Sequence, residues 1–205
     1  PYTTLFRSNG REDLSPAEFY GQWKALHHRL MEELPSFRTE ARLYAQGLAM
    51  LYRQYGFSRN PAEDVKVMLR YQGTRTAYPE VKAVVESLAT QYLLYVASTT
   101  DTAPLLRDLA RAGLRFQHVF TSEALGAYKP SPAFYQPILR ALSLSPKETV
   151  FVGDSLKDDV AGPRKVGMRA VWVNRKSLPV GDVFPDAIVS SLEELSGVLE
   201  AWKEI

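Results

Sequence analysis

The stretch TVFVGDSLKDDV at residues 149–160 constrains the fold of this chain more than any other. It opens with four apolar or β-branched residues, 149–152, which show no alternation with polar residues. Such a run is typical of a strand that is buried on both faces of a parallel sheet. Gly153 follows, and the next positions contain three acidic residues: Asp154, Asp158 and Asp159. Because ligands bind at the carboxyl ends of strands in open α/β sheets, these acids predict a ligand site.

Two interpretations of the acids are compatible with this stretch alone. Carboxylates gathered at a strand end suit Mg²⁺, a hard cation that takes oxygen ligands and keeps several waters. An ordinary helix N-terminus suits them equally, because the helix dipole favours acidic residues in the first turn. The surrounding sequence is needed to choose between a metal site and a helix start.

From Tyr78 onward, predicted helices and strands alternate along the chain. The predicted strands cover residues 92–97, 118–121, 149–152, 169–173 and 187–189. The predicted helices cover residues 80–90, 102–112, 132–142, 159–166 and 192–202. Such alternation favours right-handed crossovers and a parallel sheet. We therefore expect residues 79–205 to form a three-layer, Rossmann-like α/β domain.

Residues 12–78 have a helical pattern instead. Ser15 and Pro16 provide an N-cap and a proline at the first helical position. Apolar residues then recur at steps of three and four: Phe19, Trp23, Leu26 and Leu30. This spacing predicts one buried helix face. With two further helices expected at 38–55 and 60–73, the segment should form a small bundle.

Ligands other than carboxylates are scarce in this chain. It has no cysteine, which excludes disulfides, thiolate metal sites and a cysteine nucleophile. His27 and His28 are adjacent on a predicted helix and therefore point to different faces. We interpret them as surface or core residues, not as ligands.

The bulk composition argues against several partners. The formal net charge of +2 is too small to indicate a nucleic acid or an anionic membrane surface. No apolar run approaches the about 18 residues of a membrane span, and no signal peptide is visible. No glycine-rich phosphate loop of a nucleotide-binding protein is present. A cytoplasmic protein, monomeric or homodimeric, is the expectation.

The beginning of the chain is unusual. It starts at Pro1 without methionine, and residues 1–8 read PYTTLFRS, which matches an in-frame translation of a common sequencing adapter. We therefore expect residues 1–11 to be a non-native N-terminus and linker, with native sequence resuming near Asn9 after an upstream truncation.

Two further stretches carry polar groups at or near strand ends. YLLYVASTTD, residues 92–101, ends in a row of hydroxyls at Ser98, Thr99 and Thr100. Hydroxyls and free N–H groups at such a place form an anion site. Ordinary N-capping by Thr100 or Asp101 is the alternative, although it accounts for one hydroxyl rather than three.

The second of these stretches is AYKPSPAFY at residues 127–135, which places Lys129 just before a proline-stiffened turn and a helix. A lysine at such a place can neutralise a phosphoryl oxygen. Taken alone, it would more often be an exposed loop lysine.

The order of these three stretches resembles motifs two, three and four of the haloacid dehalogenase-like (HAD) hydrolase superfamily. GDSLKDDVAGPRKVGM is especially similar to the fourth motif and the helix that follows it. The resemblance covers residues 79–200, and the helical segment before them resembles the helical (C1) cap that this superfamily inserts after its first strand.

The resemblance implies roles for individual residues. Ser98 and Thr99 would bind the transferring phosphoryl group, and Lys129 would balance its charge. Asp154 would be a Mg²⁺ ligand, assisted by Asp158, which stands where asparagine is frequent. Asp159 matches the second acid of the motif and would support both the metal and the lysine. The resemblance therefore implies Lys129 and Asp159 as catalytic residues and the three acids as the metal site.

One motif of the family is missing. Its first strand ends in Asp-x-Asp, where the first Asp attacks phosphorus and the second acts as general acid and base. No Asp-x-Asp occurs in the 205 residues. The missing strand would lie between the strands that end at Ser98 and Asp154, and residues 2–6 are extended-favouring enough to occupy that position.

We therefore expect the intact protein to be a Mg²⁺-dependent phosphatase of small phosphorylated metabolites that forms an aspartyl-phosphate, and the present chain to be inactive. One alternative is a 2-haloacid dehalogenase of the same superfamily, which needs no metal and normally lacks the acid found here at Asp154. Another is a non-catalytic binding or regulatory protein. A receiver-like signalling domain shares the sheet and the acids but gives no reason for the helical segment. The sequence does not indicate which metabolite would bind.

Overall fold

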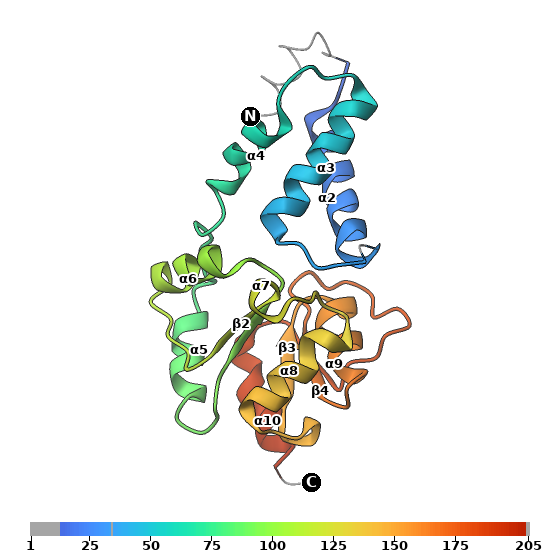
Figure 1. The fold of residues 1–205 in the computed structure, drawn as a ribbon. Helices are drawn as coiled ribbons and strands as arrows, with labels where there is room; N and C mark the ends of the chain where they lie inside the picture. Colours follow the sequence, from blue (N-terminus) through green and yellow to red (C-terminus); the bar gives the residue numbers. More distant parts are fainter. Residues whose placement is uncertain (1–12, 34, 204–205) are drawn as a thin grey trace.

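The computed structural model describes residues 13–33 and 35–203, which form two parts (Figure 1). The helical part consists of α2 (Pro16–Glu33), α3 (Glu40–Tyr55) and α4 (Pro61–Leu69), at the top of Figure 1. The α/β part begins at α5 and lies below it. Among the described helices, none is long and apolar enough to cross a membrane.

Local sequence signals set the ends of the helices in the helical part. Pro16 and Pro61 are the first residues of α2 and α4, where a missing backbone N–H does no harm. The side chains of Thr39 and Asn60 accept hydrogen bonds from N–H groups in the first turns of α3 and α4. Gly56 ends α3 with a φ of 72°, a left-handed conformation that glycine adopts without strain.

The predicted apolar face of α2 is confirmed. Its four predicted residues are buried: Phe19, Trp23, Leu26 and Leu30. They belong to one cluster with buried residues of α3 and α4, among them Leu43, Leu48, Leu51, Tyr52 and Val65. Gly47 allows the close approach of the two longer helices, because a Cβ at this position would lie 3.2 Å from Cδ1 of Trp23.

The α/β part alternates helices and strands as expected. Its first half contains α5 (Val81–Leu88), β1 (Val96–Ser98), α6 (Thr102–Arg111), β2 (Val119–Thr121), α7 (Ser122–Leu125) and α8 (Pro132–Leu142). Its second half contains η1 (Pro146–Glu148), β3 (Val150–Gly153), η2 (Leu156–Ala161), α9 (Gly162–Arg164), β4 (Arg169–Val173), β5 (Ala187–Val189), η3 (Leu192–Glu194) and α10 (Leu195–Ala201).

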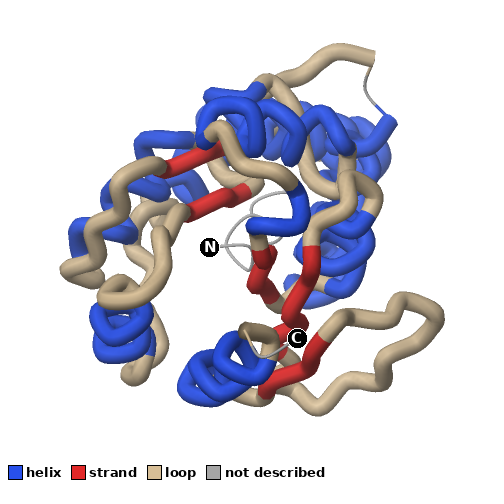
Figure 2. Tube along the Cα trace, turned by 90° about the horizontal axis from the view of Figure 1, so that it is seen from below, coloured by secondary structure: helices blue, strands red, loops and turns tan. Residues whose placement is uncertain are grey.

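The described strands form two parallel ladders. In the first, β1 pairs with β2, with Val96 opposite Val119. In the second, β4 lies between β3 and β5, with Val150 opposite Arg169 and Val171 opposite Ala187. Figure 2 shows the two ladders as separate groups of red strands. The predicted occupation of a central strand position by residues 2–6 lies outside the described residues.

Helices cover both faces of the second ladder. One apolar cluster joins the ladder to α5 and α10 through Leu88, Val171, Val173, Val189 and Leu195. Another packs α8 around Phe151 of β3 and contains Phe134, Tyr135, Ile138, Leu139 and Met168. The predicted α/β fold, with a parallel sheet between two helical layers, is therefore confirmed.

The burial of β3 differs from the prediction. The sequence indicates a strand buried on both faces, but all four residues of β3 are only half-buried. The more deeply buried strand is β4, where Arg169 is exposed but the other four residues are buried: Ala170, Val171, Trp172 and Val173. The physical reason is that β4 has a strand on each side, whereas β3 is paired only with β4 among the strands that the structure describes.

Two predicted boundaries are also corrected. The strand predicted at 92–97 forms a ladder only at Val96–Ser98, because its partner β2 is equally short. The helix predicted at 159–166 begins earlier, as the π-helical turn η2, since the side chain of Ser155 already accepts a hydrogen bond from the N–H of Asp158. The predicted bounds of α8, β4 and β5 are confirmed.

Replacing Phe134 with alanine tests the placement of the α8 layer. Phe134 is fully buried, so Phe134→Ala should lower the free energy of unfolding by about 3–5 kcal/mol in urea titrations. Phe184→Ala is a matched control because Phe184 is 70% exposed, and such surface changes usually alter stability by about 0.5 kcal/mol or less. Equal losses for the two variants would contradict this core.

Candidate active site

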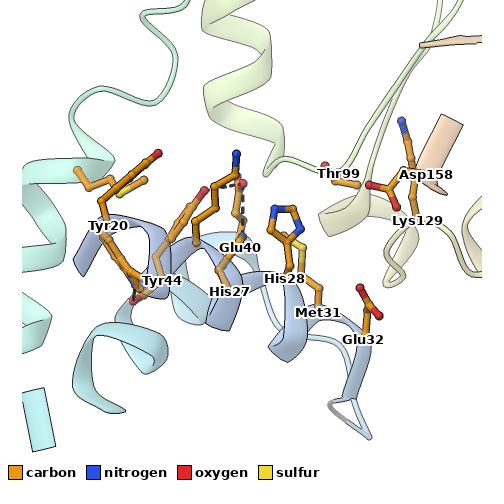
Figure 3. A pocket seen from close by; sticks show the side chains of 13 residues that line it. Tyr20, His27, His28, Met31, Glu32, Glu40, Tyr44, Thr99, Lys129 and Asp158 are labelled. Carbon is orange, nitrogen blue, oxygen red and sulfur yellow. Dashed lines mark hydrogen bonds and ion pairs between the residues drawn. The ribbon is translucent and has the colours of Figure 1, made fainter. Parts of the chain in front are cut away.

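The three stretches singled out in the sequence meet at one cavity. It has a volume of about 120 Å³ and lies where the helical part faces the α/β part. Thr99 follows β1, Lys129 precedes α8, and Asp158 lies in η2; all three line the cavity (Figure 3). The carboxyl ends of β1 and β3 thus contribute to one site, as expected for an open α/β sheet.

The centre of this site is an ion pair between Lys129 and Asp159. Lys129 Nζ lies 2.8 Å from Asp159 Oδ1, and both side chains are 9% exposed. The ammonium group also lies over the ring of Phe151, 4.7 Å from its centroid. The backbone N–H of Ser155 donates to the other carboxylate oxygen of Asp159 at 3.0 Å. An exposed loop lysine, the alternative interpretation of Lys129, is therefore wrong.

Gly153 makes room for this pair. A Cβ added at Gly153 would overlap the carboxylate of Asp159. A glycine is therefore required as the last residue of β3, because the carboxylate of Asp159 packs against this end of the strand to reach Lys129 and the N–H of Ser155.

The other two acids differ in their surroundings. Asp154 is exposed, and its backbone carbonyl accepts a hydrogen bond of 3.0 Å from Nε1 of Trp172. Asp158 is half-buried, and its pKa is raised by burial and by the nearby charge of Asp159. The hydroxyl of Tyr135 donates to the carbonyl of Asp158, which anchors η2 to α8.

The carboxylates fit Mg²⁺ only in part. Within residues 13–33 and 35–203, no group of three or more His, Cys, Asp or Glu side chains is arranged to hold a metal. Both oxygens of Asp159 already accept hydrogen bonds, which suits a role in supporting Lys129 and gives no support to Asp159 as a metal ligand. Asp154 and Asp158 remain as oxygen donors, and Mg²⁺ often binds through one or two carboxylates together with waters and substrate phosphates.

The three hydroxyl residues at the end of β1 have different surroundings. Ser98 is half-buried, and its Oγ accepts a hydrogen bond of 3.3 Å from the N–H of Thr100. Thr99 lines the cavity. Thr100 is buried and donates its hydroxyl to Glu40 Oε2 at 2.7 Å, across to the helical part.

Asp101 also bonds to the helical part. Its two carboxylate oxygens accept hydrogen bonds from the N–H groups of Glu40 at 2.8 Å and Ala41 at 3.0 Å, the first turn of α3. It forms no side-chain cap on α6, its own helix. The alternative interpretation, in which Thr100 or Asp101 caps the helix that follows, is therefore wrong: the side chains of both bind α3.

The helical part also contributes side chains to the cavity, two of which, His27 and His28, were predicted from the sequence to be surface or core residues. Tyr20, His27, His28, Glu40 and Tyr44 all line it. Glu40 is buried, and burial is the main cause of its raised pKa. In the sequence Glu40 is an ordinary acid in the first turn of a helix, and no local signal relates it to residues after β1.

His27 is a core residue, as interpreted from the sequence, yet it also lines the cavity. It is 3% exposed and stacks on the ring of Tyr44 with centroids 4.0 Å apart. Its Nε2 lies 3.8 Å from Glu40 Oε1. Burial, followed by the charge of His28, lowers the pKa of His27 to about 4, so the imidazole is neutral at pH 7 and the contact is not an ion pair.

Replacing Gly153 tests the packing of the Lys129–Asp159 pair. Gly153→Ala should displace the Asp159 carboxylate and lower the free energy of unfolding by about 1–3 kcal/mol. Gly21→Ala is the matched control: Gly21 is within α2 with no atom close to the added Cβ, and this change should stabilise the helix by about 0.5–1 kcal/mol. Thermal or urea unfolding measures both; a neutral Gly153→Ala would contradict the steric requirement.

The protonation of His27 predicts a dependence of stability on pH. The pKa of His27 is about 4 in the folded chain and 6.5 when unperturbed. The unfolded chain therefore binds more protons in this window, so stability is full above pH 6.5 and falls as the pH drops towards 4. In His27→Leu, the loss of unfolding free energy between pH 7 and pH 4 should be smaller by about 2–3 kcal/mol. Urea unfolding at a series of pH values measures this loss. His118→Leu, at an exposed histidine, is the matched control for the removal of a histidine outside this cavity.

Comparisons with known proteins agree with this geometry. The family model of haloacid dehalogenase-like hydrolases matches residues 6–167, which is more than half of the chain. Phosphoserine phosphatase of Thermus thermophilus is 29% identical over 194 residues, covering 87% of this chain and 78% of that protein. Glyceraldehyde 3-phosphate phosphatase of Pyrococcus furiosus is 34% identical over 89 residues, covering 42% of this chain and 37% of that protein.

Solved structures give the same assignment. The 2-haloacid dehalogenase of Pseudomonas syringae pv. Tomato is 30% identical with a TM-score of 0.68, covering 97% of this chain and 89% of that structure. L-2-haloacid dehalogenase of Xanthobacter autotrophicus shares the fold at 19% identity, with a TM-score of 0.76 over 98% of this chain and 93% of that structure. The chain belongs to the family of haloacid dehalogenase-like hydrolases.

Proposed function

We propose that this chain carries the phosphoryl-binding part of a Mg²⁺-dependent phosphatase that acts on small phosphorylated metabolites. The observation that carries the proposal is the buried Lys129–Asp159 pair beside a cavity lined by Thr99, Lys129 and Asp158. A cation held at the wall of a cavity, next to hydroxyls at a strand end, suits the binding of a phosphate group.

Lys129 is the residue that balances the charge of the phosphoryl group. An ammonium group has three N–H donors. One of them is used by Asp159, and the aromatic ring of Phe151 lies against the group, which leaves donor capacity towards the cavity. Because the ammonium group of Lys129 is almost buried, water and salt screen its attraction for an anion less than they screen that of a surface lysine.

Ser98 and Thr99 would add hydrogen bonds to the phosphoryl oxygens. Ser98 is the last residue of β1 and Thr99 follows it at the carboxyl edge of the sheet, where Thr99 lines the cavity. Asp154 and Asp158 are the carboxylates that would hold Mg²⁺. When bound, Mg²⁺ neutralises negative charge on phosphoryl oxygens.

Residues 12–78 would act as a cap and residues 79–205 as the core of the enzyme. In support of this division, α2 and α3 supply one wall of the cavity and the segments after β1 and β3 supply the other. A cap that closes over a bound phosphate monoester excludes water from the reacting group and strengthens its electrostatic interactions.

We assign no catalytic nucleophile to this chain. No Asp-x-Asp is present in the 205 residues, and phosphate monoester hydrolysis relies on enzymatic accelerations of up to about 10²¹. We therefore propose that the chain binds phosphate without turning over phosphate monoesters.

A 2-haloacid dehalogenase is the second candidate function. The observation in its favour is the 30% identity to the Pseudomonas syringae enzyme over 97% of this chain. Against it stands Asp154, an acid directly after Gly153 that a metal-independent dehalogenase does not require. The named phosphatases among the relatives also favour the first candidate.

Binding and turnover assays test the proposal together. In the presence of Mg²⁺, the chain should bind inorganic phosphate, and Lys129→Ala should weaken this binding by about tenfold or more. Lys82→Ala, at an exposed lysine of α5, is the matched control and should have no effect. No turnover of p-nitrophenyl phosphate is expected.

Two results would contradict the proposal. Turnover of p-nitrophenyl phosphate that disappears in Asp154→Ala would refute the absence of catalysis. Halide release from 2-chloropropionate without added metal would favour the dehalogenase instead.

A further inference from the structure

Polar groups of the helical part remain unsatisfied at the end of the cavity opposite Lys129. Figure 3 shows Thr99, Lys129 and Asp158 on one side of the cavity and Glu40 and Tyr44 on the other. His27 lies with the second group and is 3% exposed. Within the described part of the chain, neither of its ring nitrogens has a hydrogen-bond partner. Buried polar groups without partners are rare, so this pair of nitrogens needs an explanation.

Packing alone does not provide one. Stacking on Tyr44 accounts for the position of the imidazole ring but uses neither nitrogen. Glu40 Oε1, at 3.8 Å from Nε2, is too far for a hydrogen bond. The histidine is therefore positioned beside a polar neighbour without bonding to it.

Glu40 itself has unused acceptor capacity on the same side. Its Oε2 accepts two hydrogen bonds, from Thr100 Oγ1 at 2.7 Å and from Gln72 Nε2 at 3.0 Å. Its Oε1 accepts one, from the hydroxyl of Tyr44 at 3.2 Å. A carboxylate oxygen can accept two, so the free position is on the oxygen that is nearest to His27.

The charge of this end of the cavity favours one class of ligand. Glu40 is a buried carboxylate, and no lysine or arginine of the described residues forms an ion pair with it. The charge of Arg75 acts on Glu40, but its guanidinium group is paired with Asp108 at 2.7 Å. Lys24 and His28 also line the cavity, but both are exposed and therefore well screened by water. A ligand carboxylate would meet like charge at Glu40, whereas an ammonium or hydroxyl group would supply the missing donors.

The size of the cavity sets a limit on the ligand. Its volume of about 120 Å³ is well below the roughly 300–1,000 Å³ of pockets for drug-sized ligands. An organic group of two or three carbons fits this limit.

We propose that His27 and Glu40 form a leaving-group subsite that selects phosphate monoesters of short amino alcohols or polyols over those of hydroxy acids. The inference rests on the proposed function, because it takes the Lys129 end of the cavity as the phosphoryl site. Glu40 would accept a hydrogen bond from the ammonium or hydroxyl group. Nε2 of neutral His27, the nitrogen nearest Glu40, would accept from an ammonium group or, in the other tautomer, donate to a hydroxyl oxygen.

Three ligands of nearly equal size test this selectivity by isothermal titration calorimetry of the 205-residue chain with Mg²⁺. They are 2-aminoethyl phosphate, 2-hydroxyethyl phosphate and 2-phosphoglycolate, which differ only in an ammonium, hydroxyl or carboxylate end. The first two should bind about tenfold more tightly than 2-phosphoglycolate. Inorganic phosphate, measured in parallel, reports on the phosphoryl end alone.

Substitutions then assign the selectivity to the two residues. Glu40→Gln should bring the three affinities to within about threefold of one another and leave inorganic phosphate unchanged. Glu63→Gln, at an exposed glutamate of α4, is the matched control and should keep the wild-type ratio. Thermal unfolding checks that each variant folds, because Glu40 also joins the two parts of the chain.

A second variant decides the question if Glu40→Gln does not fold. His27→Leu keeps the charge of Glu40 and should weaken 2-hydroxyethyl phosphate by about tenfold without changing inorganic phosphate. Equal binding of 2-phosphoglycolate by the wild-type chain, or unchanged ratios in folded variants, would overturn the subsite. If inorganic phosphate does not bind, or if Lys129→Ala does not weaken it, the proposed function itself fails, and the inference fails with it.

Discussion

The Lys129–Asp159 pair is the interaction on which the geometry of the candidate site depends. Withdrawing two charges from water is expensive, and their attraction offsets this only when the geometry is good and the remaining hydrogen bonds are made. Here the ring of Phe151 lies against the ammonium group, and the N–H of Ser155 satisfies the second carboxylate oxygen. Gly153 allows both by leaving the space that a Cβ would occupy. The end of β3, the start of η2 and the approach to α8 are thereby fixed to one another.

A second set of polar contacts joins the helical part to the segment after β1. Asp101 caps the first turn of α3, and Thr100 donates to Glu40 on the same turn. The hydroxyl of Tyr128, next to Lys129, donates to the carbonyl of Arg38 at 2.9 Å. The segments that would bind phosphate therefore also hold the helical part in place.

Much of the fold follows from local sequence. Runs of apolar residues, capping side chains and turn glycines are short-range signals, and they predicted the bounds of α8, β4 and β5 and the apolar face of α2. The degree of burial of β3 was not predictable in this way. The apolar residues of a strand show only that burial is favourable. How far the strand is buried depends on which strands pair with it, and that is a property of the whole sheet.

The sequence by itself determined the parallel α/β architecture. It also indicated Thr99, Lys129 and the acids after β3 as site residues, because ligands bind at the carboxyl ends of the strands in such a sheet. Only the tertiary structure decided what the side chains do there. It paired Asp159 with Lys129, turned Asp101 towards α3, and placed His27 and Glu40 in the same cavity as Lys129. Such contacts join segments far apart in the chain, and no local pattern specifies them.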